Sequence, residues 1–220
     1  MSILRRVRAH LAQRIRPVQP PAAAAPSSPE TLAQSPAILE PAGARNNPAA
    51  DAAIETVSIA DTLRVEEVAD AGFYAGDLFR ARFGAAIPDY PRHFVAFHRD
   101  ASSALRVVSY IHYMAWEDHS WLCGGLCVDP AAYQRASPAE ATAWKHAGGI
   151  GEIVLRDTLA RLTDRAAVFG YCGDARQWQH DLNVGFVPAG PRHLLVIWNK
   201  PLPPAEQERL IERAVALGHF

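Results

Sequence analysis

The stretch KHAGGIGEIVLRDTLARL, residues 145–162, decides the fold that the sequence predicts. Three glycines, Gly148, Gly149 and Gly151, stand directly before a run whose apolar residues recur at helical spacing. A glycine-rich turn that opens a helix can hold a phosphate, because the first N–H groups of a helix have no partner within it and the helix dipole adds positive charge there. The same pattern is typical of a plain strand-to-helix turn, and the sequence leaves both interpretations open.

The composition is that of a chain with a substantial hydrophobic core and little net charge. Hydrophobic residues make up 49% of the 220 residues, and the formal net charge is −1. This balance gives no sign of a polyanionic partner, so we expect no nucleic acid partner. The charge is unevenly distributed, because residues 1–29 hold five arginines and no acidic residue. The body of the protein is therefore mildly acidic, and its N-terminus is a basic arm.

The three cysteines, Cys123, Cys127 and Cys172, form an odd set in a chain with no clear signal peptide. This pattern indicates reduced thiols and a cytoplasmic protein. No metal is expected, because Cys123 and Cys127 on one strand would lie about 13 Å apart, too far for a shared zinc ion. No apolar run approaches the roughly 18 residues that a membrane span needs.

The first 55 residues read as two segments outside the folded domain. Residues 1–16 place apolar residues at helical intervals between arginines, which is typical of a helix on an anionic membrane surface, a targeting peptide or a solvated basic tail. Weak membrane contact through this arm would make the protein peripheral to the membrane. Residues 17–55 are rich in proline and alanine and are predicted to be a disordered linker. The folded domain is predicted to span residues 56–220.

From residue 62 onward, the sequence carries a series of strand and helix patterns. Such an order is typical of the α/β class, with one mixed central sheet flanked by helices. The strand 119–129 is joined to the strand 166–173 through a helix, so these two strands should be parallel. The pattern predicts strands at 62–69, 93–100, 104–116, 119–129, 166–173 and 193–202, and helices at 71–86, 152–163, 174–184 and 203–220.

Two motifs in this order resemble those of the GCN5-related N-acetyltransferases, the GNAT superfamily. The stretch HAGGIGEIVL is similar to that family's diphosphate loop, Arg/Gln-x-x-Gly-x-Gly/Ala, with Gly149 and Gly151 at the glycine positions and His146 where Arg or Gln is usual. The stretch DARQWQHDLNVGFVPAG is similar to the family's next helix, which closes with Gly-Phe, here Gly185 and Phe186. The chain thus resembles a divergent GNAT member over most of its predicted domain.

The resemblance implies a GNAT-like fold and an acyl-CoA cofactor, either acetyl-CoA or another acyl-CoA. In this family the pantetheine arm pairs with a strand that bulges away from its parallel neighbour. Gly124 and Gly125 are compatible with such a bulge or with a close backbone approach, although they could instead relieve crowding from Trp121. The resemblance places the pantetheine arm at Leu126, Cys127 and Val128, and the diphosphate at the backbone N–H groups of Gly148, Gly149, Ile150, Gly151 and Glu152.

The reaction that the resemblance implies is direct transfer of an acyl group to the amine of a small molecule or a peptide. Such a reaction needs a base for the amine and an acid for the leaving thiolate. Glu117, and after it His119, are the candidates for the base, and Tyr171 is the candidate for the acid. Purely structural roles also remain open. Glu117 and His119 could lie in a solvated hairpin tip, and Tyr171 could be a core tyrosine.

Two departures from the family pattern favour a different function. An extra segment, residues 130–147, precedes the glycine turn and reads as an additional helical turn or a lid. The tyrosine often found near the end of the Gly-Phe helix is missing, and that region reads QHDLNV. The alternative is therefore a non-catalytic GNAT-like domain that binds a ligand or a partner and is tethered by the basic arm. With either function, the protein could be a monomer or a homodimer.

Overall fold

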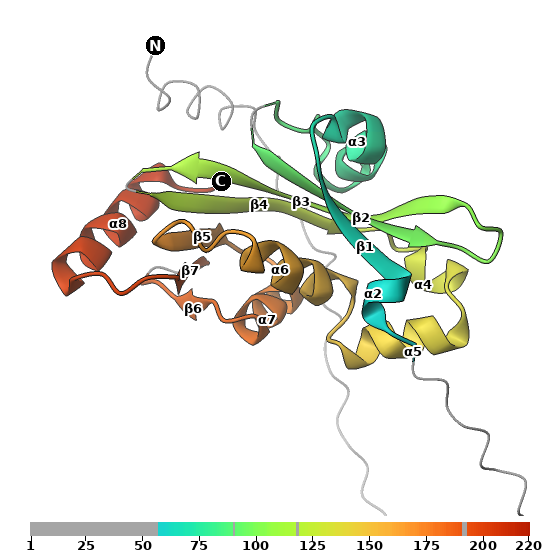
Figure 1. Ribbon diagram of the computed structural model, residues 1–220. Coiled ribbons are helices and arrows are strands. Elements are labelled where there is room, and N and C mark those ends of the chain that lie inside the picture. Colours follow the sequence, from blue (N-terminus) through green and yellow to red (C-terminus); the bar gives the residue numbers. More distant parts are fainter. Residues whose placement is uncertain (1–56, 90, 118, 191–192) are drawn as a thin grey trace, which may run out of the picture. The chain divides into compact units, whose positions relative to one another are not determined.

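The computed structural model describes residues 57–89, 91–117, 119–190 and 193–220 (Figure 1). The predicted basic arm, residues 1–16, and the predicted linker, residues 17–55, lie outside the described residues.

A seven-stranded sheet forms the centre of the described domain, with the strand order β1-β2-β3-β4-β5-β7-β6. Only the contact between β4 and β5 is parallel, and every other neighbouring pair is antiparallel. The predicted mixed α/β fold and the predicted parallel pair are both confirmed. The strands are β1 Leu63–Val68, β2 Arg92–Arg99, β3 Leu105–Trp116, β4 Ser120–Val128, β5 Ala167–Tyr171, β6 Val187–Pro188 and β7 Leu194–Trp198.

Local signals explain where the helices begin and end. Helix α3 begins after Asp70, whose carboxylate accepts a hydrogen bond from the Phe73 amide, and it ends at Gly84, which has a φ of 68°. Helix α3 therefore ends three residues before the end of the predicted helix, 71–86. The helices are α2 Ile59–Thr62, α3 Ala71–Phe83, α4 Ala132–Arg135, α5 Pro138–His146, α6 Ile150–Ala160, α7 Ala175–Asn183 and α8 Pro204–Leu217.

The segment 130–147 contains two helices, α4 and α5, rather than a single extra turn. A capping box begins α5, because the Ser137 side chain accepts a hydrogen bond from the Glu140 amide and the Glu140 side chain accepts one from the Ser137 amide. Pro138 occupies the first helical position, where its missing N–H has no cost. The segment is thus an ordered part of the domain that leads directly into the glycine turn.

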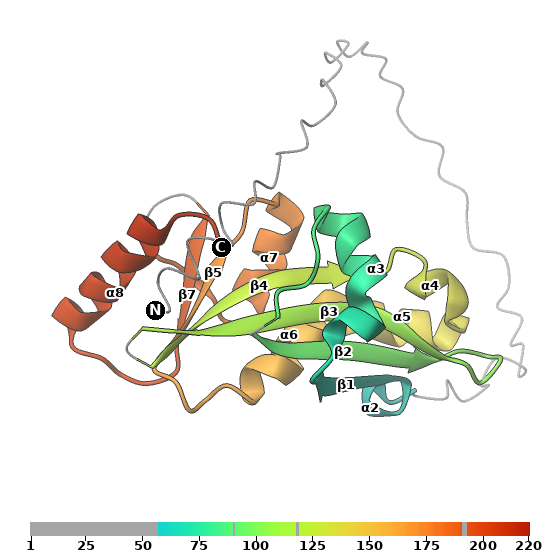
Figure 2. The ribbon, with the colours of Figure 1, turned by 90° about the horizontal axis from the view of Figure 1, so that it is seen from above.

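Helices cover both faces of the sheet. The side chains of β3 point alternately to the two faces, and their contacts show which helix covers which face. The side chain of Ile111 packs into the core with α6, whereas Tyr110 packs with α3 and Met114 packs with α8. Because side chains alternate between the faces of a strand, α3 and α8 share one face and α6 lies on the other. Figure 1 shows α3 across the strands from α6 and α7, and Figure 2 shows α3 and α8 well separated along β3 and β4.

Candidate functional site

Strands β4 and β5 separate at the middle of the sheet. Their parallel pairing runs from Ser120 with Ala167 to Cys123 with Gly170. Strand β4 continues to Val128, and on this side no strand of the described domain pairs with it after Cys123. Gly124, Gly125, Leu126 and Val128 are partly exposed, although β4 is the fourth of seven strands. The middle of the sheet therefore has an accessible strand edge, which we call the wedge, formed by residues 124–128.

A β-bulge lies at the start of the wedge. Tyr110 pairs with Cys127 but His112 pairs with Gly124, so β4 has one extra residue at this point. Gly125 has a φ of 67°, and a Cβ at this position would lie 2.6 Å from the His112 ring and 2.8 Å from the Phe79 ring. The bulge with which the glycine pair was compatible is present, and the atoms nearest to Gly125 belong to side-chain rings rather than to another backbone. The close neighbours are His112 and Phe79, not Trp121.

The glycine turn ends helix α5 and begins helix α6. Gly148 and Gly149 have φ values of 91° and 95°, which other residues rarely adopt. The Gly148 amide donates to the Lys145 carbonyl at 3.1 Å, and the Gly149 amide donates to the Trp144 carbonyl at 2.7 Å. Two of the five predicted phosphate donors therefore bind carbonyl groups of α5.

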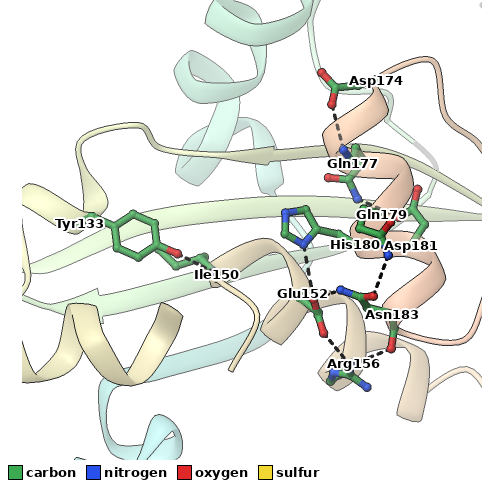
Figure 3. A network of polar contacts seen from close by, with 10 residues as sticks. All are labelled: Tyr133, Ile150, Glu152, Arg156, Asp174, Gln177, Gln179, His180, Asp181 and Asn183. Carbon is green, nitrogen blue, oxygen red and sulfur yellow. Dashed lines mark hydrogen bonds and ion pairs between the residues drawn. The ribbon is translucent and has the colours of Figure 1, made fainter. Parts of the chain in front are cut away.

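Tyr133, from the segment before the turn, binds a third predicted donor. The Ile150 amide donates to the Tyr133 hydroxyl at 3.0 Å (Figure 3). Among the described residues, the amides of Gly151 and Glu152 have no hydrogen-bond acceptor. These two amides are the donors that the first turn of α6 still offers to a ligand.

Gly151 links the glycine turn to the wedge. A Cβ at Gly151 would lie 3.7 Å from the Val128 side chain and 3.8 Å from the Leu126 side chain. The structure thus brings together three of the predicted cofactor-binding residues. Cys127 points to the opposite face, where it is 3% exposed and packs with α3. Only its backbone could take part in binding at the wedge.

Glu152 places a negative charge beside the same turn. Its side chain is ion-paired with Arg156 at 2.6 Å, accepts a hydrogen bond from Asn183 at 3.2 Å and lies 3.4 Å from His180 (Figure 3). Burial by itself would raise the pKa of Glu152, but the hydrogen bonds from these three residues bring the pKa below its usual value. A Cβ at Gly148 would lie 2.4 Å from this carboxylate. An ionised carboxylate therefore already lies against the turn that was predicted to bind a diphosphate.

The structure does not bring the candidate bases to the glycine turn. Glu117 forms an ion pair with Arg213 of α8, and His119 is exposed with a φ of 57°. Both lie at the β3–β4 turn, and from His119 to Val128 the strand extends roughly 30 Å at the usual rise per residue. Tyr171 lies closer to the wedge, because it directly follows the last residue of β5 that pairs with β4.

Tyr171 is in contact with the C-terminal residues. Its hydroxyl lies 3.1 Å from Nε2 of His219, and the two rings stack with their centroids 4.4 Å apart. The phenol of Tyr171 is therefore hydrogen-bonded to an imidazole. Whether Tyr171 acts as an acid stays a prediction.

Three groups near the wedge were not predicted from the sequence. Tyr133 carried no signal, because its partner is a backbone amide that only the fold brings near. Asp181 is 8% exposed and accepts a hydrogen bond from Gln177 at 2.8 Å, and burial raises its pKa. The four-residue spacing of Gln177 and Asp181 on a helix was a visible signal for this pair. His112, over the bulge, could have been placed on the face of β3 by the alternation of that strand.

The described residues contain neither a candidate metal centre nor a membrane-spanning helix. No group of three or more His, Cys, Asp or Glu side chains there could hold a metal ion. No helix of the described ranges has the length and hydropathy needed to cross a membrane.

Comparison with known proteins finds similarity in solved structures alone. No protein-family model matches the chain, and no curated protein matches it significantly. A GNAT family acetyltransferase from Brucella melitensis, in complex with acetyl-CoA, is 14% identical, with a TM-score of 0.45 over 66% of this chain and 92% of that chain. An acetyltransferase of the GNAT family from Staphylococcus aureus is 12% identical, with a TM-score of 0.43 over 63% of this chain and 99% of that chain. The KacTA–DNA complex is 16% identical, with a TM-score of 0.43 over 69% of this chain and 99% of that chain.

The solved structures to which the chain is similar include GNAT acetyltransferases. At these identities the likeness concerns the fold alone.

Proposed function

We propose that the described domain is an acyl-CoA-dependent N-acyltransferase, which binds its acyl donor along the wedge and transfers the acyl group to the amine of a small molecule or a peptide. The observation that supports this proposal is the separation of β4 from β5 after Cys123. It leaves partly exposed backbone in the middle of the sheet, next to the first turn of α6. An extended amide-containing arm can pair with such an edge as an added strand does.

The residues of the site fit such a donor at two points. Leu126 and Val128 border the free edge, and Gly151 lies against both, so a pantetheine arm on the edge would lead to the first turn of α6. At that turn, the amides of Gly151 and Glu152 are available to a phosphate oxygen. A bound acyl-CoA would supply an activated thioester, and the chain would supply orientation and proton transfer.

Binding of acetyl-CoA is the first test of this proposal. Thermal unfolding is measured with and without acetyl-CoA, and isothermal titration gives the Kd. At a concentration one hundred times the Kd, binding should stabilise the protein by about 2.7 kcal/mol. Release of free thiol is then followed with glycinamide, N-acetyl-lysine amide, spermidine and 2-phenylethylamine as acceptor probes.

A matched pair of glycine variants tests the location of the phosphate. Gly151→Glu should abolish binding while the fold remains, because a Cβ there meets only ordinary van der Waals contacts. Gly76→Glu adds the same charge on α3, where a Cβ has nothing within 4 Å, and should bind acetyl-CoA as the unaltered protein does. If Gly151→Glu binds acetyl-CoA normally, the diphosphate is not held at this turn.

One observation favours the second function, a non-catalytic domain that binds a ligand or a partner. The Glu152 carboxylate already lies against the turn, where the negative charge of a diphosphate would lie. The Tyr133 hydroxyl already accepts the hydrogen bond from Ile150 that a phosphate oxygen would accept. If neither the unaltered protein nor a Glu152→Gln variant binds any acyl-CoA, the turn is structural and this second function is the better one.

A further inference from the structure

Three polar side chains form a hydrogen-bonded chain on the sheet face that carries α3 and α8. Nδ1 of His93, on β2, lies 2.9 Å from the Tyr110 hydroxyl, and the same hydroxyl lies 3.2 Å from Nδ1 of His112. His93 is 6% exposed and Tyr110 is fully buried, whereas His112 is only half-buried. These hydrogen bonds therefore connect the buried His93 to the imidazole of His112, which is partly exposed to solvent.

The imidazole of His112 lies over the opening of the wedge. Its Nε2 is 3.0 Å from the place that a Cβ would take on Gly124, the first residue of β4 beyond the pairing with β5. Along β3, His112 stands between Tyr110, which packs with α3, and Met114, which packs with α8. An acceptor that approaches the wedge between these two helices would meet this ring.

The shared hydroxyl couples the tautomers of the two imidazoles. A hydroxyl donates only one hydrogen bond, so Tyr110 donates to one ring and accepts from the other. We assign the donated hydrogen bond to Nδ1 of His93, because His93 is the more deeply buried of the two rings. Burial lowers the pKa of His93, which agrees with a neutral ring that accepts this bond. Tyr110 then accepts from Nδ1–H of His112, and in this tautomer the lone pair of His112 is on Nε2.

We propose that His112 is the general base of the acyl transfer, and that Tyr110 and His93 are positioning residues that hold its tautomer. This proposal rests on the proposed function. The amine nitrogen forms a bond with the acyl carbon, the carbon–sulfur bond breaks, and the sulfur leaves with the electron pair. The amine proton passes to Nε2 of His112, and the imidazolium then gives it to the thiolate or to solvent. The products are one amide and one thiol.

The tautomer is tested first, on the full chain without acetyl-CoA. Long-range ¹H–¹⁵N correlation spectra distinguish protonated from unprotonated imidazole nitrogens, and His112→Gln identifies the His112 signals by their loss. We expect Nδ1 protonated and Nε2 unprotonated on His112, and a mixture of tautomers in Tyr110→Phe. A proton fixed on Nε2 of His112 in the unaltered protein would overturn the proposal.

The kinetic test separates binding from chemistry. General base catalysis contributes roughly 10²–10⁴-fold, so His112→Gln should lower kcat by about a hundredfold or more. The Kd for acetyl-CoA should stay within twofold, and added imidazole should restore part of the rate of His112→Ala. Thermal melts confirm that both variants fold.

The outcomes distinguish this proposal from the function on which it rests. If acetyl-CoA does not bind, the transferase itself fails. If acetyl-CoA binds and is used, but His112→Gln and His112→Ala keep the rate of the unaltered protein, only the role of His112 fails. If acetyl-CoA binds and none of the four amine probes reacts, the base has no substrate and the proposal is also overturned.

Discussion

Replacing Glu152 by glutamine should tighten the binding of acetyl-CoA. The carboxylate of Glu152 is 5% exposed, and its pKa is below the usual value, so it is charged at neutral pH. It lies beside the two amides, of Gly151 and Glu152, that the first turn of α6 offers to a phosphate. Glutamine has the same shape and can still accept the hydrogen bond from Asn183, but it does not repel a diphosphate.

The size of the effect follows from the distance between the charges. A phosphate oxygen at the Gly151 amide would lie about one helical turn, roughly 5.4 Å, from the carboxylate. Two unit charges at that separation repel by about 3 kcal/mol at an effective dielectric constant of 20. Arg156, ion-paired with Glu152 at 2.6 Å, offsets about half of this repulsion. About 1.5 kcal/mol remains, which corresponds to a roughly tenfold lower Kd in the variant.

Isothermal titration with acetyl-CoA at constant ionic strength measures this effect. Asp157→Asn is the matched control, because it removes one negative charge from the same helix, where Asp157 is ion-paired with Arg161. The control should change the Kd by less than twofold. Equal Kd values for Glu152→Gln and the unaltered protein would refute the reasoning, because the diphosphate would then lie far from the turn.

Three further predictions concern the same region. Burial holds the pKa of His93 below its usual value of 6.5, so below that pH the unfolded chain binds more protons than the folded one, and stability is lost as the pH falls toward the folded-state pKa. His93→Gln should therefore reduce the difference in free energy of unfolding, measured in urea, between pH 7.5 and pH 5.5; an unchanged difference would assign the acid sensitivity to other groups. Gly125→Ala should destabilise the protein by about 1–3 kcal/mol, because of its positive φ and the Cβ contacts with His112 and Phe79; a stability equal to that of the unaltered protein would show that the bulge relaxes. Tyr133→Phe should cost about 1 kcal/mol of stability through the lost hydrogen bond from Ile150. It should also bind acetyl-CoA more tightly, because it frees that amide, and weaker binding in titration would show instead that the hydroxyl contributes to the ligand site.

The elements that the sequence predicted well carry strong local signals. Strand β5 is nearly all apolar and is buried on both faces, as its composition indicated. Helix α7 begins after Asp174, whose side chain accepts hydrogen bonds from Arg176 and Gln177, and the chain leaves it at Gly185, which has a φ of 108°. These signals lie within a few residues of the ends that they mark, and for this reason they can be read without the fold.

Other elements were missed or shortened for physical reasons. Strand β6, Val187–Pro188, has two residues, too few for any periodic pattern. Helix α5 carried a readable signal, the capping box of Ser137 and Glu140, in a polar stretch that was predicted to be only an additional helical turn or a lid. Helix α6 begins at Ile150, two residues earlier than predicted, because Gly149 acts as its N-cap and Gly151 lies inside its first turn.

By itself, the sequence determined the class of fold, the parallel pair of strands and the glycine turn before α6, and it left a bulge at Gly124 and Gly125 as one of several interpretations. Each of these depends on local spacing or on backbone freedom at a glycine. Only the tertiary structure decided what the turn contacts. Glu152 contacts His180 and Asn183 of α7, which lie 28 and 31 positions further along the sequence. Ile150 donates a hydrogen bond to Tyr133, which lies 17 positions earlier. It also decided that His112, rather than the turn containing Glu117, lies over the wedge, because pairing between β3 and β4 sets which side chain faces the bulge. Such contacts join segments far apart in the chain, and no periodicity within either segment encodes them.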